Sequence, residues 1–205
     1  QAQPTASRDR PTEDRFRTYV GATFGQGMPA LRDRDAVPDD SKRHFAGTLS
    51  RVVRNSDGLA GVLSVNFGLP VKVDSFAARW MTLPTDQRSR LGARSGAATL
   101  GQGAVVGSRV RDAQHHFAIH LGPMSFAGYE QLLPSGGWHA RLRDWVLQYV
   151  GEEYGVHATL TLRRSEVPAM QLGRAGRLGW TTWAGRPPGD GDVQGVRLAL
   201  TRAAQ

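Results

Sequence analysis

The chain has 205 residues, 40% of them hydrophobic, an ordinary globular composition that is long enough for one large domain or two small ones. It contains no cysteine, which excludes disulfides, thiolate zinc sites, iron–sulfur clusters and cysteine nucleophiles. The formal charge of +8 comes almost wholly from arginine, because Lys42 and Lys72 are the only lysines.

The placement of the arginines bears on the kind of partner. A nucleic-acid-binding module would gather them on one face with aromatic residues between them. Here they are scattered: the densest group is Arg88, Arg90 and Arg94, and the only adjacent pair is Arg163 and Arg164. Arginines that meet carboxylates on a protein partner explain the same charge, so nucleic-acid binding is kept as the alternative. No stretch approaches the roughly 18 apolar residues that cross a bilayer, so no direct membrane insertion is expected.

The N-terminal part is predicted to contain a tail, a short apolar segment and a helix. Residues 1–15 are polar, with prolines and charges of both signs, and are expected to be a disordered tail or linker. After a short apolar period at residues 16–24, a helix follows residues 38–40. Asp40 or Ser41 is its expected cap, and its buried stripe is expected to be Phe45, Leu49, Val52 and Val53.

The next helix is predicted to have Asp57 as its cap and to stop at Gly68, with Leu59, Val62, Leu63 and Phe67 on its buried face. A strand is expected at residues 71–76. Residues 79–110 are rich in glycine and indicate a long irregular loop that ends in a strand; loops of this length are usually functional. Apolar alternation then predicts a strand at residues 116–121, and Ser125 is placed to cap a short helix.

Residues 132–167 carry the clearest signals in the chain. Apolar residues recur at helical spacing, which predicts one buried face made of Trp138, Leu142, Trp145, Val146, Tyr149 and Val150. Gly151 follows, where a left-handed residue can end the helix. From residue 156 the period changes to two, so a strand with Ala158, Leu160 and Leu162 on the core is expected. Further strands are predicted at residues 180–183 and 193–200.

The order helix, strand, proline-bearing loop with two Leu-Gly steps, strand occurs twice in the chain. This recurrence favours a weak internal repeat, with two unrelated helix–strand units as the alternative. The predicted fold class is α+β, with two related helix–strand modules and mostly antiparallel strands. We place the first module at residues 16–121 and the second at residues 122–205.

Signals for catalysis and cofactor binding are weak. His116 and His120 have the spacing of a helical metal pair, but on a strand they would lie roughly 13 Å apart. Glu152 and Glu153 could form an acid–base pair, but a solvated turn is the better interpretation. A hydrolase would require a pocket that gathers one of these glutamates or a histidine. No catalytic residue, metal site or cofactor is therefore predicted.

Several segments resemble one known family. They are FAGTLS, DGLAGVLSVNFGLPVKVDSF, RWMTLP, VVGSRVRD, FAIHLGPMSFAGYEQLLPSGG, LQYVGEEYGVHATLTL, LGRAGRLGW and TTWAG. In order and spacing, from about residue 16 to about residue 200, they are similar to TssG (ImpH/VasB) of the bacterial type VI secretion system. The N-terminal signatures of that family, His-Arg and Arg-Ala-Trp, do not occur, so the chain looks like a C-terminal portion.

The resemblance implies a non-catalytic structural subunit of the baseplate wedge. Its implied partners are TssF copies, trimers of the adaptor TssK, and TssE and the VgrG hub in a six-wedge assembly. Its implied location is cytoplasmic, at a baseplate docked on the inner membrane.

Two loops are the expected docking elements, and we call residues 84–103 and 168–179 the first and second foot loops. They carry apolar and arginine side chains among glycines, a pattern that suits insertion into a protein partner. Each foot loop is expected to insert Leu or Trp side chains into one TssK trimer. The residues expected at the contacts are Leu91, Arg94, Leu100, Leu172, Arg174, Leu178 and Trp180.

Overall fold

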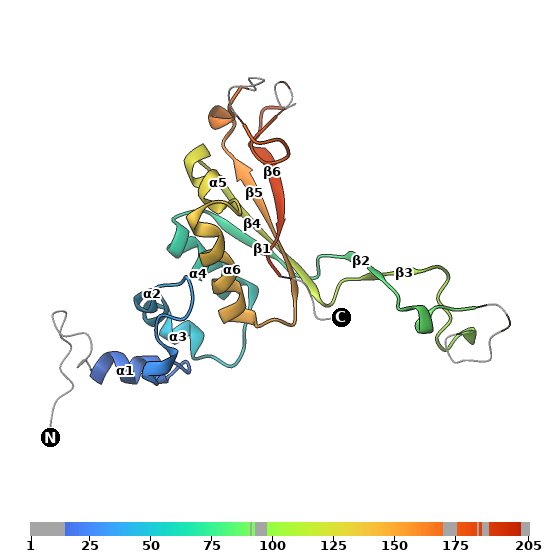
Figure 1. Ribbon diagram of the computed structural model, residues 1–205, viewed down its shortest axis with the longest axis horizontal. Coiled ribbons are helices and arrows are strands. Elements are labelled where there is room, and N and C mark those ends of the chain that lie inside the picture. Colours follow the sequence, from blue (N-terminus) through green and yellow to red (C-terminus); the bar gives the residue numbers. More distant parts are fainter. Residues whose placement is uncertain are drawn as a thin grey trace.

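The computed structural model describes residues 15–90, 92, 98–169, 176–183, 185 and 189–201. A four-stranded sheet with helices packed against it forms the body, and a two-stranded arm projects from one end of that sheet (Figure 1). The α+β class and the mostly antiparallel pairing are confirmed. The residues expected to form an N-terminal tail lie almost wholly outside the described part.

The N-terminal helices are shorter than predicted. They are α1 (Arg15–Ala22), α2 (Asp39–His44) and α3 (Ala46–Leu49), with a 3-10 turn at Pro29–Leu31. Leu49 is buried, but Val52 and Val53 lie beyond α3 and are 97% and 78% exposed, so their predicted place in a buried stripe is wrong. The cause is local, because Arg54 donates to the carbonyl oxygens of Thr48 and Leu49 and thereby closes the helix C-terminus.

Helix α4 (Ser56–Phe67) has the predicted buried face and the predicted stop. Gly68 has φ 64° and ψ 30°, the left-handed conformation that ends a helix. The cap was misassigned: the side chain of Asn55 accepts from the backbone N–H of Gly58, and Asp57 lies in the first turn instead. Asp57 there still interacts favourably with the helix dipole.

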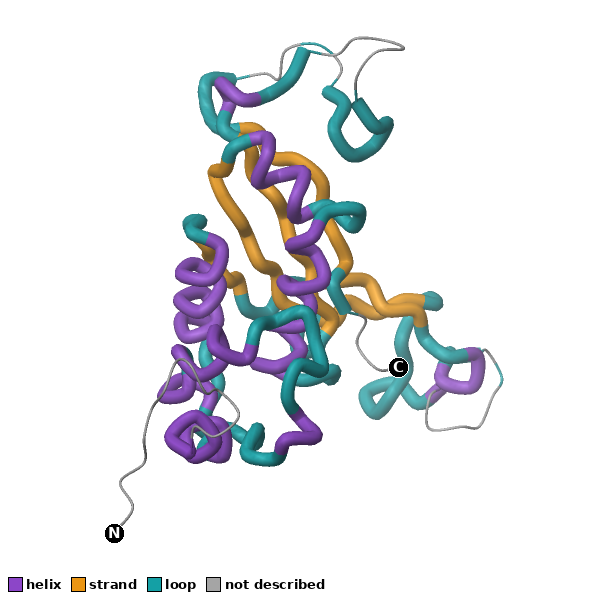
Figure 2. The backbone as a smooth tube through the Cα atoms, turned by 60° about the vertical axis from the view of Figure 1, so that its left-hand side comes forward, coloured by secondary structure: helices purple, strands orange, loops and turns teal. Residues whose placement is uncertain are grey.

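The body sheet has the order β1 (Val71–Asp74), β4 (His116–Met124), β5 (Gly155–Leu162) and β6 (Val193–Ala199). The outer pairs β1–β4 and β5–β6 are antiparallel, whereas the central pair β4–β5 is parallel. The parallel pair requires a crossover, which α5 (Phe126–Leu132) and α6 (Gly137–Val150) provide (Figure 2). The predicted strands at residues 116–121 and 193–200 are thus confirmed, and Ser125 caps α5 as expected.

One face of the sheet builds the core. The register places Ile119 beside Ala158 and Leu121 beside Leu160, and all four side chains belong to the buried cluster. Helix α6 contributes Trp145, which is fully buried, and its whole predicted stripe lies in or against that cluster. The opposite face carries the alternate residues of β4 and β5, which are mainly polar: His116, Ala118, His120, His157, Thr159 and Thr161. The glycine at the end of α6, Gly151, has φ 79° but ψ −166°, so it turns the chain without the left-handed helical conformation predicted for it.

The order helix, strand, long connection, antiparallel strand does occur twice. It appears as α4, β1 and β4, and again as α6, β5 and β6. Both pairs nevertheless share one sheet and one core, and the boundary placed at residue 121 falls within β4. The two modules therefore remain a prediction about a sequence repeat, and they are not two separate cores.

Two predictions about irregular segments are wrong. Residues 79–110 do end in a strand, β3 (Arg109–Asp112), as predicted, but they do not begin as a loop, because β2 (Arg79–Thr82) pairs with β3 as an antiparallel ribbon. All four β2 residues are exposed, so no apolar alternation marks the strand in the sequence. The strand predicted at residues 180–183 is a turn, in which the N–H groups of Trp180 and Thr181 both donate to the carbonyl oxygen of Arg177.

Candidate partner-binding surfaces

Two long connections leave the body sheet at its opposite ends. The first, residues 75–115, starts after Asp74, which pairs with Ala118 near the start of β4. The second, residues 163–192, starts after Leu162, which pairs with Met124 at the end of the parallel neighbour β4. We call them the first and second connections. Since β4 has nine residues, their roots are separated by roughly 25 Å along the strands.

The first connection forms an arm of β2 and β3, and the described part of the first foot loop lies toward the far end of this arm (Figure 1). Three of its large apolar side chains are in solvent, since Trp80 is 65% exposed, Leu100 is 92% exposed and Val106 is fully exposed, whereas Leu83 is buried. Residues 75–115 contain six arginines and two aspartates, so this segment carries a formal charge of 6 − 2 = +4. An isolated two-stranded ribbon is marginally stable in water, so the arm is suited to a partner that covers it.

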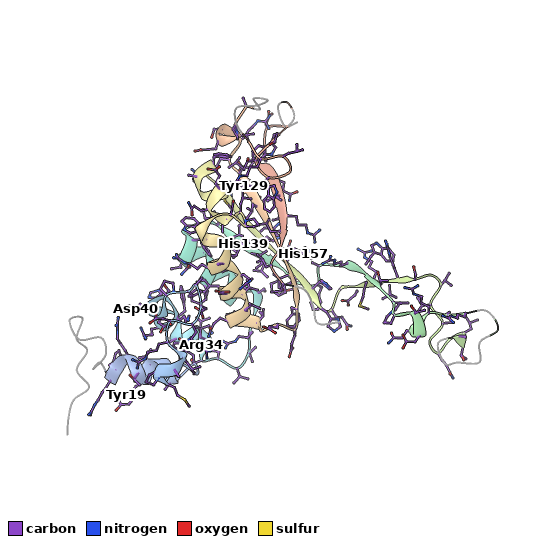
Figure 3. The ribbon with its side chains drawn as sticks, in the orientation of Figure 1. Tyr19, Arg34, Asp40, Tyr129, His139 and His157 are labelled. Carbon is purple, nitrogen blue, oxygen red and sulfur yellow. The ribbon has the colours of Figure 1, made fainter. Side chains whose placement is uncertain are left out.

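The root of the arm is held by polar contacts with the body. His157 lies on β5, a strand of the body sheet (Figure 3). Its Nε2 is 3.1 Å from Nη1 of Arg79 at the start of the arm. Asp112, opposite Arg79 in the ribbon, interacts with Nδ1 of His115 and, at 3.1 Å, with Nδ1 of His116. These contacts tie both strands of the arm to the start of β4 and to β5. None of these residues was singled out for this role from the sequence, because their partners lie up to 78 residues away.

The electrostatics of this root keep His157 neutral. The pKa of His157 is lowered to about 4, mainly by burial and in addition by the nearby charges of Arg197, Arg79 and His116. Burial acts to raise the pKa of Asp112, but hydrogen bonds from His115, from the N–H of Gln114 and from His116 outweigh it and hold that pKa below its usual value. A neutral His157 can accept a hydrogen bond from the guanidinium of Arg79.

The second connection is attached to the body through Tyr129 of α5. The hydroxyl of this fully buried residue donates to the carbonyl oxygen of Trp180 at 2.9 Å and accepts from the N–H of Val196 at 3.0 Å. The ring centroids of Trp183 and Tyr129 lie 5.8 Å apart. A Cβ on Gly195 would clash with the Tyr129 ring, so only glycine allows this approach. Burial raises the pKa of Tyr129, which therefore stays a hydrogen-bond donor at neutral pH.

The expected contact residues of the foot loops are partly described. Leu178 of the second foot loop is 90% exposed, and Trp180, just after it, is 38% exposed. Leu91, Arg94, Leu172 and Arg174 lie outside the described residues. Arg177, which the sequence did not single out, donates from its backbone N–H to Thr181 and from its side chain to Ser135. The described parts of both foot loops thus present a leucine to solvent, at opposite ends of the sheet.

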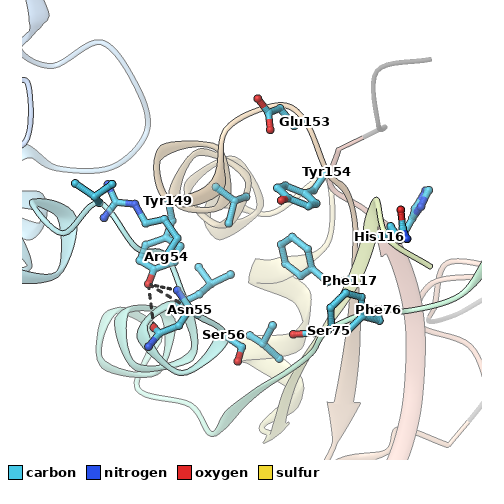
Figure 4. Close-up of a pocket in the computed structure, with 15 residues that line it drawn as sticks. Arg54, Asn55, Ser56, Ser75, Phe76, His116, Phe117, Tyr149, Glu153 and Tyr154 are labelled. Carbon is cyan, nitrogen blue, oxygen red and sulfur yellow. Dashed lines mark hydrogen bonds between the residues drawn. The ribbon is translucent and has the colours of Figure 1, made fainter. Parts of the chain in front are cut away.

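A groove of about 490 Å³ lies between the start of α4, the start of β4 and the turn after α6 (Figure 4). Its floor includes the buried Leu59 and Phe117. Its rim carries three exposed apolar side chains: Val52 at 97%, Phe76 at 72% and Tyr154 at 37%. The sequence did not indicate this groove, because Val52 was assigned to a buried helix face and Phe76 to a strand.

The groove contains Glu153 and His116, so it brings together two of the residue types that a hydrolase would need. Their side chains point in different directions, and no hydrogen bond joins them (Figure 4). Nδ1 of His116 is instead held by Asp112 at the root of the arm. This arrangement provides no paired acid and base.

Among the described residues, no group of three or more His, Asp or Glu side chains could hold a metal ion. His116 and His120 do lie on a strand, as predicted, and Nε2 of His120 pairs with Asp74 at 3.1 Å. No helix within the described ranges is long and apolar enough to span a membrane.

Comparisons with known proteins place the chain in a family. The family model "Type VI secretion, TssG" matches residues 1–185. No curated protein matches the chain significantly in sequence. Among solved structures, one similar chain belongs to a type VI secretion TssK-TssF-TssG baseplate subcomplex determined by cryo-electron microscopy, with a TM-score of 0.70 and 18% identity. That match covers 95% of this chain and 80% of that chain.

Another similar chain comes from the baseplate complex of the type VI secretion system, with a TM-score of 0.67 and 15% identity over 98% of this chain. This chain spans 59% of the length of that one. At such identities the two structures support the fold, whereas the family model covers most of the sequence. The chain therefore belongs to the TssG family of type VI secretion proteins.

Proposed function

We propose that this chain is a non-enzymatic structural subunit of a type VI secretion baseplate wedge. In this proposal it binds TssF copies and docks two TssK trimers, one through each foot loop. The solved chain similar to it comes from a TssK-TssF-TssG subcomplex, which supports this choice of partners. The wedge would then lie in the cytoplasm, at a baseplate docked on the inner membrane. TssE and the VgrG hub would be neighbours in a six-wedge assembly.

The observation that carries the proposal is the pair of connections at opposite ends of one rigid sheet. Each exposes a leucine: Leu100 on the first and Leu178 on the second. Apolar side chains at the tip of a connection contribute little to the core, whereas they can insert into a pocket on a partner. Because the connections leave opposite ends of the sheet, they can reach two separate partner copies. The +4 charge of residues 75–115 favours acidic surfaces on the partner.

The test is the mass of the complex formed with purified TssK of the same gene cluster, measured by light scattering on a sizing column. Two TssK trimers per chain are expected. A single trimer would keep adaptor binding but overturn the assignment of two docking loops. A folded chain that binds no TssK would overturn the proposal.

Variants assign the two trimers to the two loops. Leu100→Asp is expected to remove one trimer and Leu178→Asp the other, since a carboxylate cannot enter an apolar pocket without a large desolvation cost. Val65→Ser on α4, 65% exposed and outside both connections, is the matched control. TssF binding should survive both leucine substitutions; its loss together with TssK binding would indicate a damaged fold.

The alternative, a basic nucleic-acid-binding module, gives a different result in the same preparation. Binding to duplex DNA or to RNA would fall steeply with salt, because each phosphate contact releases counterions. The proposed TssK contact, in which leucines enter protein pockets and a few arginines face carboxylates, should weaken less steeply with salt. Tight, salt-sensitive nucleic-acid binding together with no TssK binding would favour the alternative.

A further inference from the structure

We propose that the groove between α4, β4 and the turn after α6 binds a segment of the TssF-type subunit, through a bulky apolar side chain accompanied by lysine or arginine. This inference rests on the proposed function and adds to it the surface that holds a second partner. The groove is separate from the two foot loops, and its rim residues Val52, Phe76 and Tyr154 belong to neither of them.

The groove has a buried apolar floor inside an exposed apolar rim. Leu59 and Phe117 are buried beneath the opening, while Val52 is 97% and Phe76 72% exposed at the rim. Such side chains gain little from folding, since their surface stays hydrated. A buried floor inside an exposed apolar rim is the arrangement that accepts an anchor side chain from another protein.

The backbone at Phe76 gives a second, independent observation. Its φ is 59°, in the left-handed region that bulky residues rarely adopt. This conformation ends β1 and leaves the Phe76 ring 72% exposed beside the groove. A strained residue that holds an aromatic ring in solvent is more consistent with a binding role than with a role in packing.

The charged residues at the groove indicate the charge expected on the segment that binds there. Arg54 lines it, but its guanidinium donates to the carbonyl oxygens of Thr48 and Leu49 and lies over the Tyr149 ring. His116 is occupied by Asp112. Glu153 is exposed, and within the described part of the chain it makes no hydrogen bond or ion pair. On a chain with a net charge of +8, the charged group that remains available in this groove is therefore a carboxylate.

A carboxylate beside an apolar pocket complements a basic residue next to an apolar anchor. The position of the groove on the molecule indicates which subunit, TssF or TssK, would occupy it. The described parts of the two connections extend from opposite ends of the sheet (Figure 1). The groove lies where α4, the start of β4 and the turn after α6 meet, so a subunit that packs along the body would contact it (Figure 4). We therefore assign the groove to the TssF-type subunit and not to the adaptor.

The experiment compares TssF binding and TssK binding of the same chain variants. Phe76→Asn keeps a residue that tolerates the left-handed conformation but removes the ring, and Val52→Ser removes the second apolar rim residue. The double variant is expected to bind purified TssF at least about tenfold more weakly, with TssK binding unchanged. Val106→Ser, fully exposed on the arm, is the matched control and should change TssF binding by less than about twofold.

Substitutions of Glu153 test the prediction that the bound segment carries a positive charge. Glu153→Arg should weaken TssF binding more than Glu153→Gln does, and the difference should shrink in high salt because the interaction lies near the surface. A photo-crosslinking phenylalanine analogue at position 76 should attach to a TssF segment that contains a bulky apolar residue beside a lysine or arginine.

The outcomes separate this inference from the proposed function. Unchanged TssF binding by the Phe76 and Val52 double variant would overturn the groove assignment and leave the proposed function intact. Crosslinks from position 76 that map only to TssK would overturn it as well. A parent chain that binds neither TssF nor TssK would overturn the proposed function, and this inference with it.

Discussion

Nη1 of Arg79 lies 3.1 Å from Nε2 of His157, and this contact joins the first residue of the arm to a strand of the body sheet. A guanidinium can only donate, so the imidazole must accept and must be unprotonated at Nε2. Asp112 makes the corresponding contact for the other strand of the arm through His116. The direction in which the arm leaves the body thus depends on a few polar side chains rather than on a shared apolar core.

Replacing His157 by leucine is expected to widen the range of arm directions, because Arg79 loses its acceptor on β5. His157→Gln is the matched control, since its side-chain carbonyl oxygen can accept from the guanidinium. Distances between spin labels at Thr82→Cys and Val65→Cys would measure the effect by pulsed electron resonance. The chain has no native cysteine to interfere. Identical distance distributions in the parent and His157→Leu would contradict the role given to this contact.

Acid should destabilise the fold through the same residue. His157 has a pKa of about 4 in the folded chain against 6.5 in an unfolded one, so between these values the unfolded state binds more protons. Stability from this group is complete above pH 6.5 and is lost as the pH falls toward 4. The groups facing it, Arg79, Arg197 and His116, all oppose its protonation. Urea unfolding at pH 7.5 and pH 5 should show a larger loss of stability for the parent than for His157→Gln; equal losses would argue against this assignment.

Lys42 is expected to be the more sensitive of the two lysines. It is fully buried, with Nζ 2.8 Å from Asp35 and 3.1 Å from Asp39. Lys42→Ala would leave the buried Asp39 with only its longer ion pair to Arg43 at 3.6 Å, and should cost about 3 kcal/mol of unfolding free energy. Lys72→Ala removes an exposed ion pair with Asp74 and should cost less than about 1 kcal/mol. Chemical unfolding followed by tryptophan fluorescence distinguishes the two, and similar losses would refute the buried ion pair.

Tyr129→Phe should loosen the second connection without unfolding the chain. The substitution keeps the ring but leaves the N–H of Val196 and the carbonyl oxygen of Trp180 without their partner. We expect a loss of about 1–3 kcal/mol and faster amide hydrogen exchange at residues 176–183. Tyr19→Phe, at a tyrosine that is 60% exposed on α1, should have no such effect. Unchanged exchange in Tyr129→Phe would show that other contacts hold this segment.

Sequence periodicity predicted the elements that face the core. The stripe of α6, the alternation of Ala158, Leu160 and Leu162 on β5, and the stop of α4 at Gly68 all follow from residue spacing or from one residue's backbone preference. These signals are reliable because burial on one face imposes a period on the sequence. The order of the strands and the parallel pairing of β4 with β5 depend on contacts between distant segments. Such contacts produce no periodic pattern in the sequence.

The predictions that were wrong concern segments without a buried face. The arm strand β2 is exposed on both sides, so its residues show no alternation. Val52 and Val53 have helical spacing but lie beyond a helix end that Arg54 closes, and no pattern of apolar residues encodes that contact. The groove, the arm root and Tyr129 likewise join residues far apart in the chain, so they became visible only in the folded structure.

Each long connection begins and ends on neighbouring hydrogen-bonded residues. Ala77 donates to the carbonyl oxygen of His116 at the first root, and Leu162 pairs with Val193 at the second. When the two ends of a connection are hydrogen-bonded to each other, the stability of the sheet depends little on the length of the connection between them. Doubling the length of a loop costs only about 0.6 kcal/mol of closure entropy. The parts of the two connections that lie beyond the contacts of Arg79 with His157 and of Trp180 with Tyr129 can therefore change in length while the core stays the same. Grafting a whole connection would transfer a choice of partner only if these anchoring contacts were transferred with it.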